Sequence, residues 1–203
     1  AEIFDPLGMV DTGFFTDPAD AERFASIYTP RDDGIAKVSE SPVVSSDRRT
    51  IYSNGYPYDG PQTYYSGGAG LSSTISDYAR FLQCLLNDGE PLVSASTFES
   101  MISNQIGELV VTEQPAANIQ LTHPFPTGAG IDKFGYGFQL SIAEDNRRRK
   151  GSYSWCGLLN TYFWGDPVEK IGGIVLMQTL PFYSPVCIGT LQGFEEKLYQ
   201  SVL

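Results

Sequence analysis

The stretch that decides the fold is residues 152–166, SYSWCGLLNTYFWGD. It contains both tryptophans of the chain and one of its three cysteines, and glycines stand at Gly157 and Gly165. Aromatic residues favour extended backbone and glycine permits a bend, so the stretch predicts a strand, a bend and a second strand. It holds no cluster of acidic, basic or metal-ligating side chains, which leaves open what so aromatic a ribbon faces.

Further strands are predicted on both sides of this ribbon. Upstream, apolar residues alternate with glycine and polar residues, the pattern of a half-buried strand, at Tyr136, Phe138, Leu140 and Ile142. Downstream, residues 171–179 (IGGIVLMQT) are apolar without alternation. A strand with two apolar faces is covered on both sides, so this segment is predicted to be a central strand.

Helices are predicted before and after the strands. Apolar residues recur at spacings of three and four, as in an amphipathic helix, at Tyr78, Phe81, Leu82, Leu85 and Leu86. A serine or threonine at 73–74 can cap this helix, and Asp77 suits its positive end. A second helix is expected at about 96–103. A third is expected at about 187–202, with an apolar side formed by Leu191, Phe194, Leu198 and Val202.

This order of elements predicts an α+β fold, in which helices pack on the faces of an antiparallel sheet. We expect a single domain over residues 1–203. It divides into a loop-rich excursion at 1–70, a helical part at 71–105, and antiparallel strands with a C-terminal helix at 134–203.

The composition disfavours several partners and leaves localisation open. The formal net charge of −11 argues against nucleic acid, because phosphate binding needs a basic face. The dense basic run at 147–150 (RRRK) is predicted to be a solvated hairpin turn, with an anionic docking spot as the alternative. No apolar run predicts a membrane span, and no signal peptide is expected in this sequence. Cys84, Cys156 and Cys187 lack metal-like spacing, so free and mostly buried thiols are expected.

A search for catalytic residues within these 203 residues finds no nucleophile with a base beside it. His123 is the only histidine and precedes Pro124 in a predicted loop, so an ordinary loop histidine is expected. No lysine has a serine three residues before it, which excludes a Ser-x-x-Lys nucleophile here. The glycines at 67–70 lack the lysine and the flanking elements of a phosphate loop. We expect no metal and no organic cofactor.

Four motifs in sequence nevertheless resemble one known family. They are IFDPLGMVDTGF at 3–14, SGGAGLSSTISDYARFLQCLLNDGE at 66–90, FGYGFQL at 134–140 and WCGLLNTYFWGDP at 155–167. Their content and order resemble the serine β-lactamase-like family, which includes class C β-lactamases, family VIII carboxylesterases and D-aminopeptidases. The resemblance implies the α+β fold of that family and a serine hydrolase acting on a small-molecule ester or amide.

The resemblance also implies a site on the aromatic ribbon. Trp155, Cys156 and Gly157 stand where the family carries a Lys-Thr-Gly-like triplet that lines the substrate pocket. The backbone N–H of Leu158 would then form half of an oxyanion hole. Trp155 in place of lysine removes a cation for a β-lactam carboxylate and favours esters or other neutral substrates. The alternative for the triplet is an ordinary aromatic strand.

A second implied part of the site is the loop at 66–74. In the family this loop borders the acyl side of the pocket, which places Gly68 and Ala69 nearest the substrate. The alternative is a loop that only caps the following helix.

The sequence departs from the family in its catalytic side chains. The family's Ser-x-x-Lys and Tyr-x-Asn precede the segment that corresponds to PLGM at 6–9. We therefore expect a C-terminal part that is inactive alone and that associates with itself or with the N-terminal part. The Tyr-Ser-Asn at 52–54 matches Tyr-x-Asn by letters but lies downstream, so a chance match is expected. The alternative function is a non-catalytic binding or scaffold module.

Overall fold

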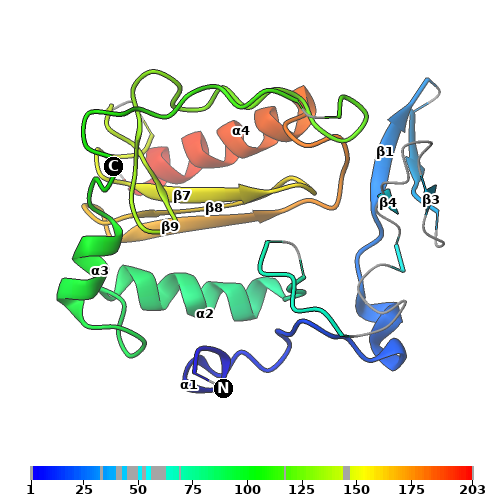
Figure 1. Ribbon diagram of the computed structural model, residues 1–203, viewed down its shortest axis with the longest axis horizontal. Helices are drawn as coiled ribbons and strands as arrows, with labels where there is room; N and C mark the ends of the chain where they lie inside the picture. Colours follow the sequence, from blue (N-terminus) through cyan, green and yellow to red (C-terminus); the bar gives the residue numbers. More distant parts are fainter. Residues whose placement is uncertain are drawn as a thin grey trace.

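Residues 152–166 form a strand, a turn and a second strand, as the sequence predicts, and they belong to a five-stranded antiparallel sheet. In the computed structural model, β7 (Tyr153–Gly157) and β8 (Thr161–Asp166) form a hairpin with a turn at 158–160. Figure 1 shows this hairpin between the two long helices. The structure describes residues 2–32, 34–39, 43–44, 50–51, 54–55, 63–68, 70–116, 118–143 and 147–202.

The strand predicted at 136–142 is much shorter in the structure. Only β6 (Gln139–Leu140) pairs there, between β7 and β5 (Lys133–Phe134). The backbone turns just before it, because the Gly135 N–H donates to the Phe138 carbonyl at 2.8 Å and Gly137 has a φ of 90°. Tyr136 is therefore exposed, and both residues of β6 are buried, so the alternation does not hold.

The last strand, β9 (Ile171–Leu176), lies at the end of the sheet order β5-β6-β7-β8-β9. Within the described part of the chain it is an edge strand, so its prediction as a central strand is wrong there. Its apolar character has another cause, which is close packing on both faces. A Cβ added at Gly172 would lie 2.9 Å from Leu82 of α2, and one added at Gly173 would lie 2.0 Å from the Trp164 ring.

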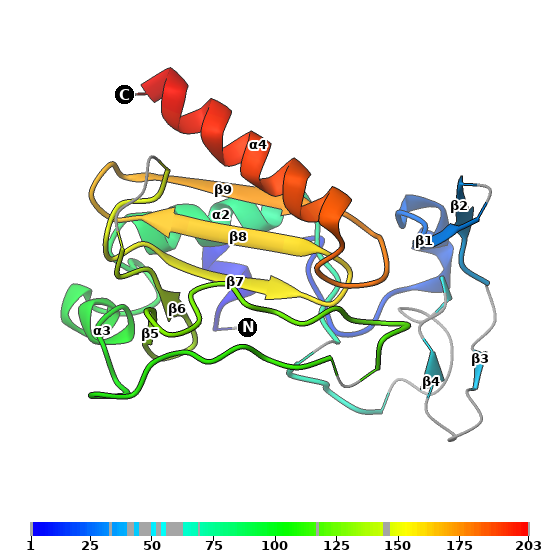
Figure 2. The same ribbon diagram turned by 90° about the horizontal axis from the view of Figure 1, so that it is seen from above.

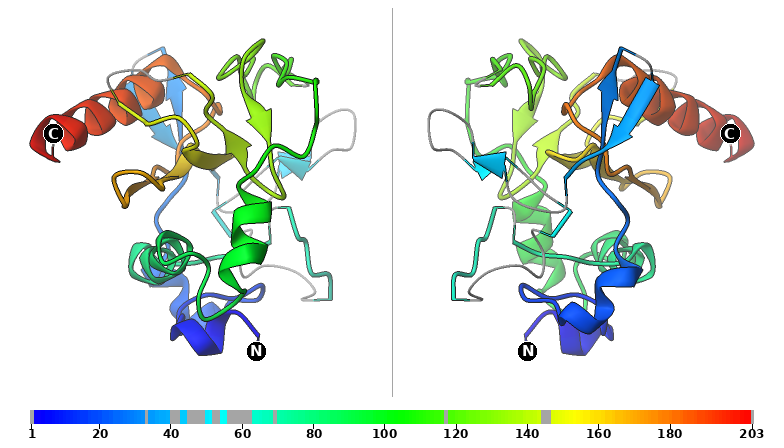
Figure 3. Two further views of the ribbon diagram at one scale, coloured as in Figure 1. Left: turned by 90° about the vertical axis from the view of Figure 1, so that its left-hand side faces the viewer. Right: turned by 90° about the vertical axis from the view of Figure 1, so that its right-hand side faces the viewer.

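One face of the sheet packs against α2 (Ile75–Leu86) and α3 (Ala95–Met101), close to their predicted bounds. Thr74 caps α2 as expected, because its hydroxyl accepts the Asp77 N–H at 3.2 Å. Figures 2 and 3 show α2 and the C-terminal helix on opposite faces of the sheet. The buried core on the α2 side is formed by Leu82, Leu85, Phe98, Phe138, Leu140 and Tyr153.

The opposite face packs against α4 (Pro185–Val202). Its buried residues are Cys187, Leu191, Glu195 and Tyr199. The predicted apolar side of this helix is therefore only partly right. Phe194 and Val202 are exposed, because the helix is rotated so that Glu195 points to the sheet.

The basic run at 147–150 explains that rotation. Arg148 forms an ion pair with the buried Glu195, and its guanidinium lies 5.1 Å from the centre of the Trp164 ring. Arg149 pairs with Glu169 at 2.8 Å. The prediction of a solvated turn is wrong. Arg148 forms an ion pair with α4, and Arg149 forms one with the segment after β8, so both connect the loop before β7 to the rest of the fold.

The remaining elements lie before α2 in the chain. They are α1 (Phe4–Leu7), η1 (Pro18–Arg23), β1 (Tyr28–Arg31), β2 (Gly34–Lys37), β3 (Val43–Val44) and β4 (Thr50–Ile51). These strands form two small antiparallel pairs beside the end of the main sheet (Figure 1). Of the Tyr-Ser-Asn at 52–54, only Asn54 falls within the described residues, where its side chain accepts the Ile27 N–H at 2.6 Å. The division into one domain stays a prediction.

Candidate functional site

The second half of β7 has an open edge. β6 pairs only with Tyr153 and Ser154, so Trp155, Cys156 and Gly157 have β8 as a neighbour on one side and no strand of the described chain on the other. A strand edge of this kind offers backbone N–H and C=O groups to a ligand. The predicted triplet therefore lies on a strand edge that no other strand of the described chain covers.

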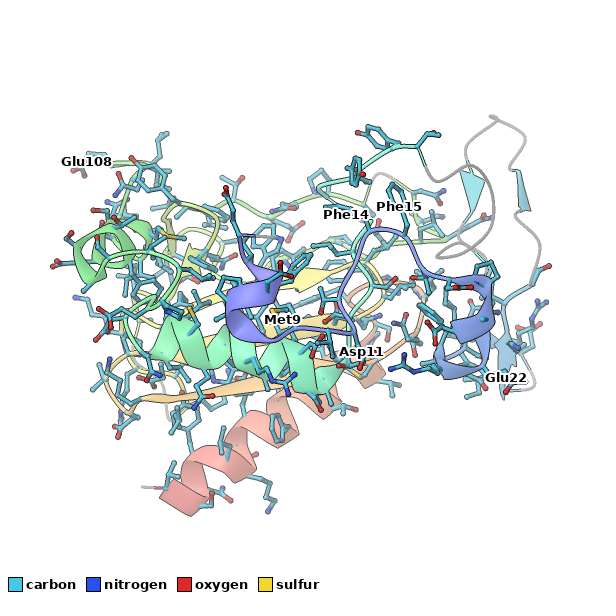
Figure 4. The ribbon with its side chains drawn as sticks, turned by 90° about the horizontal axis from the view of Figure 1, so that it is seen from below. Met9, Asp11, Phe14, Phe15, Glu22 and Glu108 are labelled. Carbon is cyan, nitrogen blue, oxygen red and sulfur yellow. The ribbon has the colours of Figure 1, made fainter. Side chains whose placement is uncertain are left out.

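A cavity of about 850 Å³ opens beside this edge, and we call it the main cavity. Trp155, Cys156 and Gly157 line it, together with residues of α2, β8 and β9. The segment from Ile3 to Ile27 forms the opposite wall, and Figure 4 shows Met9 and Asp11 of this segment alongside α2. Much of the lining is aromatic, through Phe4, Phe15, Phe24, Tyr78, Phe81, Trp155, Tyr162 and Phe163.

A smaller cavity of about 260 Å³ lies on the α4 side of the same strand. Trp155, Cys156 and Tyr162 line both cavities. Its other walls include buried polar groups, among them Asp132 and Gln139, which hydrogen-bond to each other at 2.8 Å. Two spaces therefore meet at the predicted triplet.

The three residues of the triplet differ in exposure. The Trp155 ring is 37% exposed and packs edge-on against Phe134, with ring centres 5.3 Å apart. Cys156 lies opposite Tyr162, and burial raises the pKa of its thiol to about 12. The thiol is therefore protonated at neutral pH and is a poor nucleophile. A Cβ added at Gly157 would lie 2.6 Å from the Thr161 hydroxyl oxygen, so a side chain there would crowd the turn.

The Leu158 N–H points away from the hairpin. The Gly157 carbonyl accepts the Asn160 N–H at 3.0 Å, so it points into the turn. In a trans peptide the following N–H points the opposite way, which directs the Leu158 N–H outward. Within the described residues no acceptor contacts this N–H. Leu158 is a half-buried residue that lines neither cavity itself, although Gly157 and Leu159 on either side of it line the main cavity. A backbone donor without a protein partner suits an oxyanion hole, and that role stays a prediction.

The loop predicted to border the acyl side is only partly placed at the main cavity. Gly68 is exposed and is not among the lining residues, and Ala69 lies outside the described residues. The adjacent Gly70 and Leu71 do line the cavity. The Gly70 N–H donates to the Ser66 carbonyl at 2.8 Å, which closes the loop tightly. A Cβ added at Gly70 would collide with the same carbonyl, so the loop needs glycine at this position.

Sequence reasoning missed what Asp77 does at this cavity. Its carboxylate is buried and accepts hydrogen bonds from the Asp11 N–H at 2.7 Å, the Thr12 hydroxyl at 2.9 Å and Arg80 at 2.7 Å. A bridge between Gly13 and Ser72 adds to this attachment. Asp77 thus holds the segment at 10–13 against the start of α2, as one wall of the main cavity. The motif at 3–14 indicated that this segment belongs to the family fold, but nothing in its spacing indicated that Asp77 is its hydrogen-bond partner.

Other catalytic arrangements find no support in the described part of the chain. His123 is exposed, and its backbone N–H donates to the Phe182 carbonyl at 2.9 Å. No group of three His, Cys, Asp or Glu residues there is placed to hold a metal ion. None of the helices described is both long and apolar enough to cross a lipid bilayer.

Comparison with known proteins supports the resemblance. A family model described as "Beta-lactamase" matches residues 1–192. Protein Rv1367c of Mycobacterium tuberculosis (strain ATCC 25618 / H37Rv) is 28% identical over 203 residues, which cover 94% of this chain and 45% of that protein. Acyltransferase calJ of Penicillium decumbens is 24% identical over 158 residues, or 74% of this chain and 37% of that protein. The chain therefore spans less than half the length of these relatives.

Solved structures agree on the fold. The LovD6 mutant of simvastatin synthase (LovD) from Aspergillus terreus superposes with a TM-score of 0.73 and 21% identity, over 99% of this chain and 49% of that one. EstCE1, described as a hydrolase with promiscuous acyltransferase activity, superposes with a TM-score of 0.63 and 22% identity, over 87% of this chain and 44% of that one. At these identities the likeness shows the fold alone.

Proposed function

The chain belongs to the beta-lactamase family, and we propose that it forms the pocket wall of a serine enzyme that transfers acyl groups from esters. The observation that carries the proposal is the outward-pointing N–H of Leu158, the residue directly after β7, whose neighbours Gly157 and Leu159 line the main cavity. A fixed backbone donor stabilises the charge that develops on a carbonyl oxygen during acyl transfer.

The nucleophile is proposed to come from outside these 203 residues, since none of them forms a Ser-x-x-Lys. Its serine oxygen attacks the ester carbonyl carbon while a base takes the hydroxyl proton. The carbonyl oxygen becomes an oxyanion held by the Leu158 N–H. The C–O bond to the alcohol then breaks, and the alcohol leaves with the proton. Water or a second alcohol attacks the acyl-serine in the same way and releases the enzyme.

The charges at the pocket favour a neutral substrate. Trp155 occupies the position where the family's lysine would meet a carboxylate. Arg23 is the one cation among the described residues that line the main cavity. Its guanidinium is already paired with Asp11 at 2.7 Å and Asp20 at 3.3 Å. An ester with an uncharged, apolar acyl group therefore fits this cavity better than a β-lactam carboxylate.

Both water and an alcohol are reasonable acceptors. The similar protein calJ is an acyltransferase by name, and EstCE1 is described as a hydrolase with promiscuous acyltransferase activity. Two cavities meet at Trp155 and Cys156, which leaves room for an acyl group on one side of β7 and an alcohol on the other. The ratio of transfer to hydrolysis, measured with p-nitrophenyl butyrate and added butanol, separates the two activities.

The proposed partner is the rest of the family fold, with a second copy of this chain as the alternative. Along Ile171–Leu176 the edge of β9 has no strand of the described chain beside it, and Tyr28 of β1 bridges to Thr179 only beyond its end. Exposed apolar residues lie at the main cavity at Ile3, Val10, Leu71 and Ile75. Such surfaces promote association. Mixing the 203-residue chain with the remaining segment of its gene product, followed by sedimentation analysis, should yield a 1:1 complex.

The decisive experiment removes one backbone hydrogen-bond donor, the N–H of Leu158. Leu158→Pro in the full gene product deletes the N–H, and Leu158→Ala is the matched control that keeps it. Loss of an oxyanion donor costs about 10²–10³ in kcat. We expect that loss for Leu158→Pro, with less than a severalfold change for Leu158→Ala. Equal activity of the two variants would remove Leu158 from the mechanism.

The second candidate function is the non-catalytic module, favoured by the lack of a Ser-x-x-Lys in this sequence. A fluorophosphonate probe distinguishes the two. The enzyme predicts one labelled serine in the full gene product, outside residues 1–203, and no label on the 203-residue chain alone. A full gene product that takes no label and turns over no ester would favour the module.

A further inference from the structure

We propose that Asn160 is a positioning residue, whose side chain holds the turn at 158–160 so that the Leu158 N–H stays aimed at the open edge of β7. The inference rests on the proposed function for its catalytic consequence, but not for its structural content. It assigns a role to a residue that the sequence motifs left without one.

The Asn160 side chain uses its full hydrogen-bonding capacity. Asn160 is completely buried. Its Oδ1 accepts the Tyr162 hydroxyl at 2.7 Å and the Tyr183 N–H at 2.9 Å. Its Nδ2 donates to the carbonyls of Thr179 at 2.8 Å and Pro181 at 2.9 Å. Two donors and two acceptors saturate one amide, which is the arrangement that a buried polar group requires.

These four bonds tie together three separate parts of the fold. Tyr162 belongs to β8, Thr179 and Pro181 follow β9, and Tyr183 stands just before α4. The Thr179 N–H also donates to the Leu159 carbonyl at 3.2 Å. The turn is therefore fixed to the connection between β9 and α4, and not only to its own hairpin.

The same residue sets the direction of the Leu158 N–H. The Asn160 backbone N–H donates to the Gly157 carbonyl at 3.0 Å. That carbonyl and the Leu158 N–H belong to one rigid peptide plane, so fixing one direction fixes the other. Asn160 has a φ of 58°, a left-handed conformation that asparagine tolerates better than most residues. The backbone shape and the side-chain anchor thus come from a single residue.

Asn160→Gly separates the anchor from the backbone shape. Glycine adopts the left-handed conformation freely, so the variant keeps the turn type and loses only the four side-chain bonds. Leu85→Ala is the control, because it destabilises the core on the α2 side without touching the turn. The readout that needs no activity is the ¹⁵N order parameter of Leu158 in the full gene product.

In the wild type and in Leu85→Ala we expect a Leu158 order parameter of about 0.85, typical of rigid backbone. In Asn160→Gly we expect a value below about 0.6. In the full gene product, Asn160→Gly should lower kcat for a p-nitrophenyl ester by about tenfold to a hundredfold, with KM changed less than threefold. A purely structural role would lower stability and leave kcat of the folded fraction unchanged.

The outcomes separate this inference from the proposed function. An unchanged order parameter in Asn160→Gly overturns the inference, whatever the activity. A mobile Leu158 with an unchanged kcat overturns the catalytic role of Asn160. If Leu158→Pro also keeps full activity, the proposed function fails as well. If Leu158→Pro alone loses activity, the proposed function stands and only the role of Asn160 is rejected.

Discussion

The two faces of the main sheet are built by different means. The face under α2 is apolar, and even the Tyr153 hydroxyl there has no hydrogen-bond partner within the described part of the chain. The face under α4 combines Trp164 and Leu191 with buried charges at Glu195 and Asp166. Apolar packing acts without direction, whereas a buried carboxylate must find a specific donor.

This difference decides how precisely each face holds the neighbouring loops. On the α4 side, Asp166 accepts the Arg149 N–H at 3.1 Å and the Tyr199 hydroxyl at 2.8 Å. Glu195 and Arg148 join the same helix to the loop before β7. The β7–β8 hairpin that carries the candidate site is therefore oriented by polar contacts from the α4 side and supported by apolar packing from the α2 side.

The largest effect should come from the apolar face. Phe98→Ala removes a buried ring that packs on Tyr153 at 5.6 Å between ring centres, and it should lower the free energy of unfolding by about 4 kcal/mol. Phe194→Ala is the control: its ring packs on Trp164 at 5.7 Å between ring centres but is 42% exposed, so it should cost less than half as much. Urea denaturation measures both. Equal costs would mean that Phe194 belongs to the core after all.

On the α4 side of the sheet we expect a smaller loss of stability, which a second substitution should reverse. Glu195→Leu leaves Arg148 without its carboxylate and should lower the free energy of unfolding by about 3 kcal/mol. Adding Arg148→Met should recover most of that loss, because an apolar pair replaces a buried ion pair at little cost. The double-mutant cycle is read from urea denaturation. Additive losses would show that the pair is not coupled.

Tyr199→Phe tests the second buried carboxylate. It removes the hydrogen bond to Asp166 and should cost about 2 kcal/mol at pH 7. Burial, followed by this hydrogen bond, raises the pKa of Tyr199. A raised folded pKa stabilises the protein below the ordinary tyrosine pKa of about 10, and this contribution is lost as the pH rises further. The free energies of unfolding of the wild type and of Tyr199→Phe should therefore differ less at about pH 11 than at pH 7, as measured by urea denaturation. If the difference in the free energy of unfolding were the same at both pH values, the ionisation of Tyr199 would not contribute to the pH dependence of stability.

The smallest effect should come from an exposed pair. Lys170 contacts Asp88 at 2.9 Å, with more than half of each side chain exposed. Lys170→Gln should change the free energy of unfolding by less than about 0.5 kcal/mol. If Lys170→Gln lowered the free energy of unfolding as much as Glu195→Leu, burial would not be the reason why the ion pair under α4 contributes to stability. Thermal unfolding at low and high salt gives this comparison.

Local patterns in the sequence were sufficient for much of the fold. The spacing of apolar residues predicted α2, and its threonine cap is where the sequence placed it. The aromatic stretch predicted β7, the turn and β8. These features depend on neighbours within a few residues, where backbone preference and side-chain periodicity act directly.

The errors concern contacts between distant residues. Arg148 of the basic run and Glu195 are 47 residues apart in the sequence, and the pattern around one gives no indication of the other. Residues 171–179 are apolar on both sides because the glycines of β9 admit Leu82 and Trp164, yet β9 is an edge strand in the described chain. Periodicity reports which residues are buried, but not which strand lies beside them.

The sequence by itself determined the hairpin, the helices of the α2 side and the family. Only the tertiary structure decided that the triplet at Trp155 to Gly157 lies on an open edge beside a cavity, that Asp77 holds the cavity wall, and that Asn160 anchors the turn. The reason is physical. Strand and helix preferences are local properties of the chain, whereas a buried polar group is satisfied only by partners that folding brings from elsewhere.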